Sequence, residues 1–281
     1  MSDLRKSNKS LNATPTDAIP TDEAPARLSS ARRFALILLV LFVAAGTSLI
    51  VYLAGFRLPE EYRRQAARMI APDICAAQVG DIVYLGLYEQ DNDKSDGAEP
   101  IEWIVLDKQA DRCLLMSRYA LDCVRFNTVE AFVTWEDSSL LTWLNSTFYY
   151  DAFSGAERAM IVKSAQKTDT NPYFDTNPGN VTHERIFIAN IAQIARYLPE
   201  EDSRKCAATA YTVARGAITD KESGNCIWWL RSPGFDTTTA TRVLMDGRIN
   251  YCGYRVQSKN QAVRPWMWVC LDPYHISTSE E

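Results

Sequence analysis

The longest apolar stretch of the chain runs from Phe34 to Phe56 and contains no charged residue. The hydrocarbon core of a bilayer is about 30 Å thick, and a helix crosses it with about 20 apolar residues. We therefore predict a transmembrane helix over residues 34–56. Residues 1–33 are polar and lack an apolar period, so we expect a disordered tail before the helix. The first partner that the sequence predicts is thus the lipid bilayer.

The charges beside this apolar run indicate its orientation. Basic residues before the run modestly outnumber those just after it, and an excess of Lys and Arg marks the cytoplasmic side. We expect a single-pass protein of the cell membrane with a cytoplasmic N-terminus and an extracellular C-terminal domain. A cleaved signal peptide is the alternative, but the run is too long and a polar segment precedes it.

Beyond the membrane, the pattern predicts a short stalk and one domain. Helical spacing of apolar residues favours an amphipathic juxtamembrane stalk over 57–77. Residues 78–275 are enough for one substantial core, and 276–281 form a tail. Strand patterns lie mainly near both ends of the domain, with helical patterns between them, and this order favours an α+β fold. Strands are predicted at 81–90, 101–108, 112–121, 185–190, 226–234, 239–251 and 261–271, and helices at 138–153, 154–161, 191–198 and 200–217.

Composition and charge argue against several classes of function. The formal net charge is −5 and both signs are interspersed, which gives no basis for a nucleic-acid-binding surface. His183 and His275 are the only histidines, so a multi-histidine metal site is not available. The sequence contains no nucleotide-binding, nucleophile-elbow or zinc-protease motif. We expect no metal, no cofactor and no catalytic residue.

The seven cysteines contain no CxxC pair, which argues against a zinc ribbon or a thioredoxin-like site. Cys113, Cys206 and Cys270 are typical of small residues in a buried core. Export would permit disulfides, but the sequence does not fix any pairing.

The loop from Asp91 to Gly97 is similar to a calcium-binding loop, with Glu102 at the twelfth position. Its glycine stands one position later than such a loop requires, and strands rather than helices flank it. We predict an acidic hairpin turn here rather than a metal site.

The segment from Cys226 to Val269 combines aromatic and basic residues. Tryptophan brings a large buried area, and an arginine beside aromatic strand residues can anchor loops through several hydrogen bonds. We predict structural roles for Trp228, Trp229, Arg231, Arg264 and Trp266. Polar and aromatic residues between these strands suit recognition, although an ordinary polar hairpin is the alternative. The predicted ligand-binding residues are Asp236, Thr238, Arg248, Asn250, Tyr251, Tyr254 and Arg255.

Several motifs occur in order between about Gly80 and Leu271. They include GDIVYLGLYEQDND, EPIEWIVLDK, TWEDSSLLTWLN, KCAATAYTVARGA, WWLRSPG and AVRPWMWV. Together they resemble a family of bacterial domains of unknown function (domain of unknown function 6273). The C-terminal pattern of Trp-x-Arg-Ser, an Asp-Gly turn and a final arginine-bearing strand is similar to the C-type-lectin-like fold, which includes the formylglycine-generating enzymes.

This resemblance implies a C-type-lectin-like mixed sheet with flanking helices, preceded by the single transmembrane helix. It implies a surface-displayed domain that binds an extracellular glycan or protein, with the ligand on the loops named above. The alternative is an enzyme of the formylglycine-generating type, for which Cys252 and Cys270 are the cysteines to compare. A glycan-active enzyme that uses carboxylates such as Asp236 and Asp246 is a further alternative.

Overall fold

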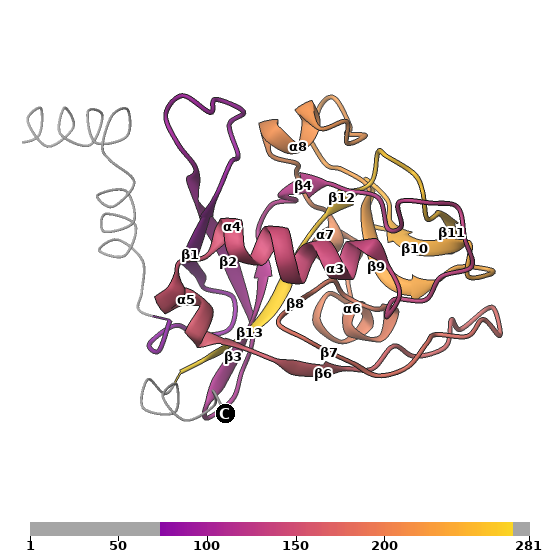
Figure 1. The fold of residues 1–281 in the computed structure, drawn as a ribbon, viewed down its shortest axis with the longest axis horizontal. Coiled ribbons are helices and arrows are strands. Elements are labelled where there is room, and N and C mark those ends of the chain that lie inside the picture. Colours follow the sequence, from indigo (N-terminus) through magenta and orange to yellow (C-terminus); the bar gives the residue numbers. More distant parts are fainter. Residues whose placement is uncertain (1–73, 272–281) are drawn as a thin grey trace, which may run out of the picture. The chain divides into compact units, whose positions relative to one another are not determined.

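The computed structural model describes residues 74–271. The predicted transmembrane helix at 34–56, both predicted tails and most of the predicted stalk lie outside the described residues. Among residues 74–271, no helix is both long enough and apolar enough to cross a membrane. The described residues form an α+β domain, as the order of the predicted elements indicated (Figure 1).

The first sheet contains six strands in the order β1-β2-β3-β13-β5, and β8 also pairs with β13. All of its pairings are antiparallel. The last strand of the domain, β13, lies between β3 and β5, so the sheet brings both ends of the domain together. The strands are β1 (Ile82–Tyr88), β2 (Glu99–Lys108), β3 (Arg112–Ser117), β5 (Ile161–Val162), β8 (Ile186–Phe187) and β13 (Trp266–Cys270).

The second sheet has five strands in the order β11-β10-β9-β12-β4. Its pairings are antiparallel except for the parallel pair β9–β12. A separate two-stranded ribbon joins β6 to β7. These strands are β4 (Asp122–Cys123), β6 (Ser164–Gln166), β7 (Thr182–Glu184), β9 (Trp228–Pro233), β10 (Thr239–Val243), β11 (Ile249–Arg255) and β12 (Ala262–Val263).

One pair of segments passes from the first sheet to the second. The predictions of continuous strands at 112–121 and 261–271 were wrong. The first strand ends at Ser117, before β4 begins in the second sheet at Asp122, and the later segment is divided between β12 and β13. β3 pairs with β13 in the first sheet, and β4 pairs with β12 in the second. The break in the later segment falls at Pro265, which has no N–H to donate to a ladder, while its carbonyl accepts a hydrogen bond from the Ser117 N–H at 2.9 Å.

Arg264 is buried at this crossing and is only 2% exposed. Its Nε donates to the Ser117 carbonyl at 3.1 Å, and its Nη2 donates to the Arg118 carbonyl at 3.5 Å. The guanidinium carbon lies 5.2 Å from the centre of the Trp228 ring. The side chain therefore holds the end of β3, the start of β13 and a strand of the second sheet in one place.

The helical segments lie between the early and late strands in the sequence, as predicted. Ser138 caps the first helix through the Leu141 N–H. Ser154 and Glu157 form a capping box at the start of the predicted helix 154–161, and Glu157 also accepts the Gly86 N–H of β1 at 3.1 Å. The segments are α3 (Ser139–Trp143), η1 (Leu144–Phe148), α4 (Tyr149–Ala152), α5 (Gly155–Met160), α6 (Ile191–Tyr197), α7 (Glu201–Arg204) and α8 (Ala210–Ala214).

The segment from α3 through α4 forms one continuous helical stretch with a π-helical turn in the middle (Figure 1). Leu140, Leu144 and Phe148 are fully buried at a spacing of four residues and mark its core face. Asn145 stands in the π-helical turn. Its Nδ2 donates to the Ile186 carbonyl at 2.8 Å, and its Oδ1 accepts the Ile186 N–H at 3.1 Å. These bonds dock the helix on β8.

The late tryptophans fill the core. Trp228, Trp229 and Trp266 are 0% exposed. Cys113 and Cys206 are buried as expected, but the prediction for Cys270 was wrong, because it ends β13 and is only partly buried.

Arg231 is the second arginine of the core and is 1% exposed. It donates to the Lys167 carbonyl, Thr168 Oγ1, the Ile188 carbonyl and Gln193 Oε1 at 2.5–3.1 Å. Burial lowers the pKa of Arg231 to about 10, and the charge of Glu184 opposes this shift. The guanidinium thus links β9 to the segments around β6 and α6.

Comparing alanine substitutions at Gly247 and Gly97 should distinguish the cost of a steric clash from the cost of backbone strain. Gly247 has a φ of +89°, and a Cβ at this position would lie 1.9 Å from the backbone oxygen of Glu201. Gly97 has a φ of +94° with no atom within 4 Å of such a Cβ. We expect Gly97→Ala to lower the free energy of unfolding by about 1–2 kcal/mol through strain alone. Gly247→Ala should cost about 1–3 kcal/mol more. Equal losses in urea denaturation would contradict the close approach of α7.

Removing the Arg231 guanidinium should destabilise the whole domain. Arg231→Ala leaves the buried Glu184 without its positive charge and several carbonyls without a donor. We expect a loss of roughly 3–5 kcal/mol in the free energy of unfolding. Arg248→Ala is the control, because Arg248 is exposed and its ion pair within the described part of the chain is with Asp246 at 2.6 Å, which predicts a change under about 1 kcal/mol. Similar denaturation midpoints for both variants would show that the network adds no stability.

Candidate functional site

A groove of about 320 Å³ lies beside the second sheet. One wall comes from the loop between β4 and α3, and the other comes from the end of β11 and the turn into β12. These walls are more than a hundred residues apart in the sequence. The lining residues are Arg125, Thr128, Tyr254, Arg255, Gln257, Ser258 and Lys259.

Hydrogen bonds join the two walls of the groove to each other. The Asn127 N–H donates to the Val256 carbonyl at 2.8 Å, and the Cys123 thiol donates to the Lys259 carbonyl at 3.0 Å. Asn127 Oδ1 also accepts the Ser139 N–H at 3.1 Å, which ties the first wall to α3. Pairing of β4 with β12 continues the same contact into the sheet. Both walls of the groove are therefore joined to each other and to the second sheet by hydrogen bonds.

The groove carries positive charge without a matching negative charge. Arg125 is partly buried, and Arg255 and Lys259 are exposed. Among the ion pairs and side-chain hydrogen bonds of residues 74–271, none involves the charged groups of these three residues. Glu130 stands at the rim, where its Oε2 accepts Gln257 Nε2 at 3.0 Å. Three cations against one engaged carboxylate make the groove suited to an anion.

Tyr254 adds an aromatic surface and a further charge behind it. The residue is 43% exposed. The guanidinium carbon of Arg242 lies 4.0 Å from the centre of its ring, which is a cation–π contact. Arg242 Nη1 donates to Gln261 Oε1 at 3.0 Å, and burial lowers the pKa of Arg242. The phenol ring is thus fixed at the groove with a fourth cation behind it.

The structure divides the predicted ligand-binding residues among separate places. Tyr254 and Arg255 line the groove. Arg248 lies at the other end of β11, roughly 20 Å away at ~3.3 Å per strand residue, and its Nε pairs with Asp246 at 2.6 Å. Tyr251 packs edge-on against Tyr173, with ring centres 4.7 Å apart.

The remaining predicted ligand residues serve local turns. Asn250 Oδ1 accepts the Gly253 N–H at 3.1 Å within β11. Asp236 Oδ1 accepts both the N–H and the hydroxyl of Thr238, at 2.8 and 2.6 Å. The Thr238 carbonyl accepts the Val256 N–H at 3.0 Å, so this loop lies near the groove although neither side chain lines it.

Sequence reasoning missed Arg125, Thr128, Gln257, Ser258 and Lys259. One signal for part of this set was available. The chain contains 35 acidic residues, yet none lies between Gly247 and Leu271, a segment that includes Arg248, Arg255, Lys259 and Arg264. That acid-free segment points to the second wall of the groove. Nothing in the sequence joins Arg125 to it.

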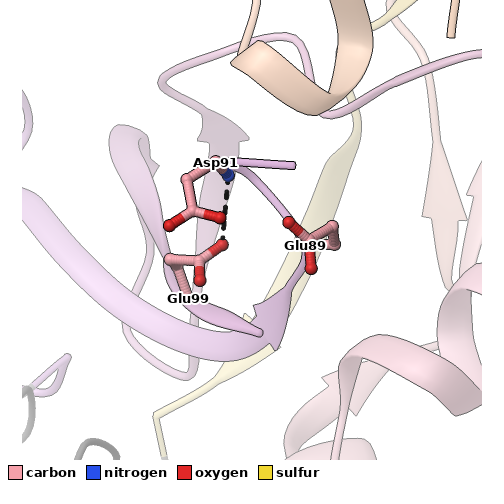
Figure 2. Close-up of side chains that lie close together, drawn as sticks. All are labelled: Glu89, Asp91 and Glu99. Atoms are coloured by element: carbon pink, nitrogen blue, oxygen red, sulfur yellow. Dashed lines mark hydrogen bonds between the residues drawn. The ribbon is translucent and has the colours of Figure 1, made fainter. Parts of the chain in front are cut away.

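An acidic cluster forms a second candidate at the β1–β2 hairpin. Carboxylate oxygens of Glu89, Asp91 and Glu99 all lie within 4.8 Å of one another (Figure 2). Such oxygens could coordinate a hard cation such as Ca²⁺. Burial is the main cause that raises the pKa of both Glu89 and Glu99, and the charge of Asp91 adds to it.

The same carboxylates also have structural roles in the hairpin. Glu99 Oε2 accepts the Gln90 N–H at 2.6 Å. It also accepts the Asp91 N–H at 3.3 Å (Figure 2). Further along the loop, Asp93 Oδ1 accepts the Ser95 N–H at 3.0 Å. Glu102, which a calcium loop would need at its twelfth position, pairs with Arg118 at 2.6 Å instead. These contacts are those of an acidic turn.

The groups required by the enzyme alternatives are not brought together. Cys252 lies in β11 of the second sheet and Cys270 in β13 of the first, so the two cysteines belong to different sheets. Asp236 and Asp246 lie at opposite ends of β10, so at least ~13 Å of strand separates them at ~3.3 Å per residue. Paired carboxylates in glycosidases lie about 5–9.5 Å apart.

Comparison with known proteins identifies one family. No curated protein and no solved structure matches this chain. The family described as Domain of unknown function (DUF6273) matches residues 110–271. The match begins after β2, so the β1–β2 hairpin with its acidic cluster lies outside it, whereas every residue of the groove lies within it. Because the match covers more than half of the chain, this protein belongs to the DUF6273 family.

Proposed function

We propose that this protein is a recognition protein whose groove binds an acidic oligosaccharide, a sugar chain that bears carboxylate, sulfate or phosphate groups. The observation that carries the proposal is the presence of three cations without ion pairs, Arg125, Arg255 and Lys259, around one groove. A folded protein usually satisfies such charges with neighbouring carboxylates or with solvent. A cluster on two facing walls favours a shared anionic ligand.

The other lining groups favour a sugar over a simple anion. Thr128, Gln257 and Ser258 offer hydroxyl and amide groups that both donate and accept hydrogen bonds. Tyr254 offers an amphipathic ring that is held in place by Arg242. Sugar rings present hydroxyls and apolar edges side by side, so they match this mixture. Binding pockets for apolar small molecules are lined mainly by hydrophobic side chains, and this groove is not.

The proposal includes display at the surface of a bacterial cell. The uncharged run at 34–56 and the slight excess of basic residues before it support a single-pass protein with its domain outside the cell. The similarity of the WWLRSPG and AVRPWMWV motifs to the C-type-lectin-like fold supports ligand recognition by the loops near β11. An extracellular glycan is the ligand that such a placement favours.

Neutralising the groove should weaken binding to acidic glycans. We expect Arg255→Ala and Lys259→Ala each to reduce affinity about tenfold, because one charge-assisted hydrogen bond contributes about 1.5 kcal/mol. Arg248→Ala is the matched control, because this exposed arginine stands just before β11 and pairs with Asp246 outside the groove. The full chain in detergent would be tested on an array of acidic glycans and their desulfated or neutral counterparts.

Three results would contradict the proposal. Equal losses from Arg248→Ala and Arg255→Ala would place the ligand outside the groove. Equal binding to acidic and neutral glycans would remove the role of the cations. Equal binding to single-stranded DNA, with a strong and uniform salt dependence, would indicate general attraction to polyanions rather than sugar recognition.

A further inference from the structure

Cys206 and Cys226 face each other on two paired segments of the chain. Ala207 pairs with Asn225 in an antiparallel bridge, so the next residues outward, Cys206 and Cys226, stand directly opposite each other. The Cys226 N–H donates to the Cys206 carbonyl at 2.8 Å. Opposed residues of this hydrogen-bonded type have Cα atoms about 5.5 Å apart. That separation lies within the range of 4.4–6.8 Å that a disulfide requires.

The two thiols also influence each other's ionisation, and the charge of Arg264 acts on both. Burial disfavours ionisation of Cys206, but the interaction with the Cys226 thiol and the charge of Arg264 outweigh it and lower the pKa of Cys206 to about 7. The Cys206 thiol itself donates to the carbonyls of Arg118 and Ala207 at 3.7 and 3.5 Å. Both residues are buried, with Cys206 2% and Cys226 0% exposed.

We propose that Cys206 and Cys226 form a disulfide when the protein folds under oxidising conditions. This modification site is independent of the groove and of its ligand. The bond would close the loop that carries α8, whose contacts reach two other parts of the domain. The Tyr211 N–H donates to the Gln90 carbonyl at 2.9 Å, and Arg215 pairs with Asp122 at 3.3 Å. A disulfide at the base of this loop would fix α8 against the β1–β2 hairpin and β4.

The chemistry is thiol–disulfide exchange with a small-molecule or protein disulfide as the oxidant. The Cys206 thiolate attacks one sulfur of that disulfide and releases its other half as a thiolate. Cys226 then loses its proton and attacks Cys206 Sγ, so that the new S–S bond forms and the second half of the oxidant leaves. Two thiols are oxidised, the oxidant is reduced to two thiols, and proton number is conserved. Because both cysteines are buried, exchange takes place during folding or in a locally opened state.

The disulfide can be detected directly by peptide mapping. Trypsin cleaves after Lys205, Arg215, Lys221 and Arg231, so the two cysteines fall in separate peptides, 206–215 and 222–231, with one cysteine each. The full chain would be refolded in detergent with oxidised and reduced glutathione, blocked with N-ethylmaleimide and digested. We expect a linked pair of these peptides that dithiothreitol separates. Recovery of both peptides in the blocked, unlinked form would overturn the proposal.

Thermal unfolding provides a second measurement. Closing a loop of about 20 residues should raise the melting temperature of the oxidised protein by roughly 5–10 °C over the reduced one. Cys226→Ser should abolish this difference, whereas Cys123→Ser, a buried thiol that donates to the Lys259 carbonyl, should preserve it. A difference that persists in Cys226→Ser would assign the effect to another cysteine pair. If Cys226→Ser fails to fold, the peptide map of the unaltered chain still decides.

Discussion

The crossing of two segments between the sheets is the constraint on which the rest of the domain depends. β3–β4 and β12–β13 pair with each other on both sides of the crossing. Both sheets depend on these two segments. In the first sheet β13 lies between β3 and β5, and in the second sheet β12 joins β4 to β9. The Arg264 guanidinium occupies the crossing, where it donates to the carbonyls of Ser117 and Arg118. A buried charge can be retained here because it donates to two backbone carbonyls and lies against the Trp228 ring.

The groove and the cysteine pair both follow from this crossing. Pairing of β4 with β12 places the loop after β4 beside the turn before β12, and these two loops form the walls of the groove. On the opposite side of β4, the Ala120 N–H donates to the Ala207 carbonyl at 3.0 Å, which brings the segment of Cys206 to the same crossing. The pairing of the two short strands β4 and β12 therefore brings together loops that are far apart in the sequence.

Local structure could be predicted from the sequence, whereas the site could not. Capping by Ser138 and Ser154, the α+β order and the burial of Cys113 and Cys206 depend on nearby residues or on residue type alone. Where the strands predicted at 112–121 and 261–271 end depends on the strands with which they pair, and the local sequence pattern does not specify those pairings. The groove needs Arg125 and Lys259 on facing walls, and only the tertiary pairing of β4 with β12 brings them together. Tyr254 and Arg255 were predicted from residue type, and that criterion also selected Arg248 and Tyr251, which have other contacts.

The distribution of charge argues that the groove is not a by-product of the fold. The chain has a net charge of −5, yet the segment from Gly247 to Leu271 contains basic residues and no acidic ones. Arg264 accounts for one of these charges by a structural role in the core. Arg255 and Lys259 have no such role among the described contacts. Positive charge without a structural role, gathered on two hydrogen-bonded walls, is the reason why we propose an anionic partner.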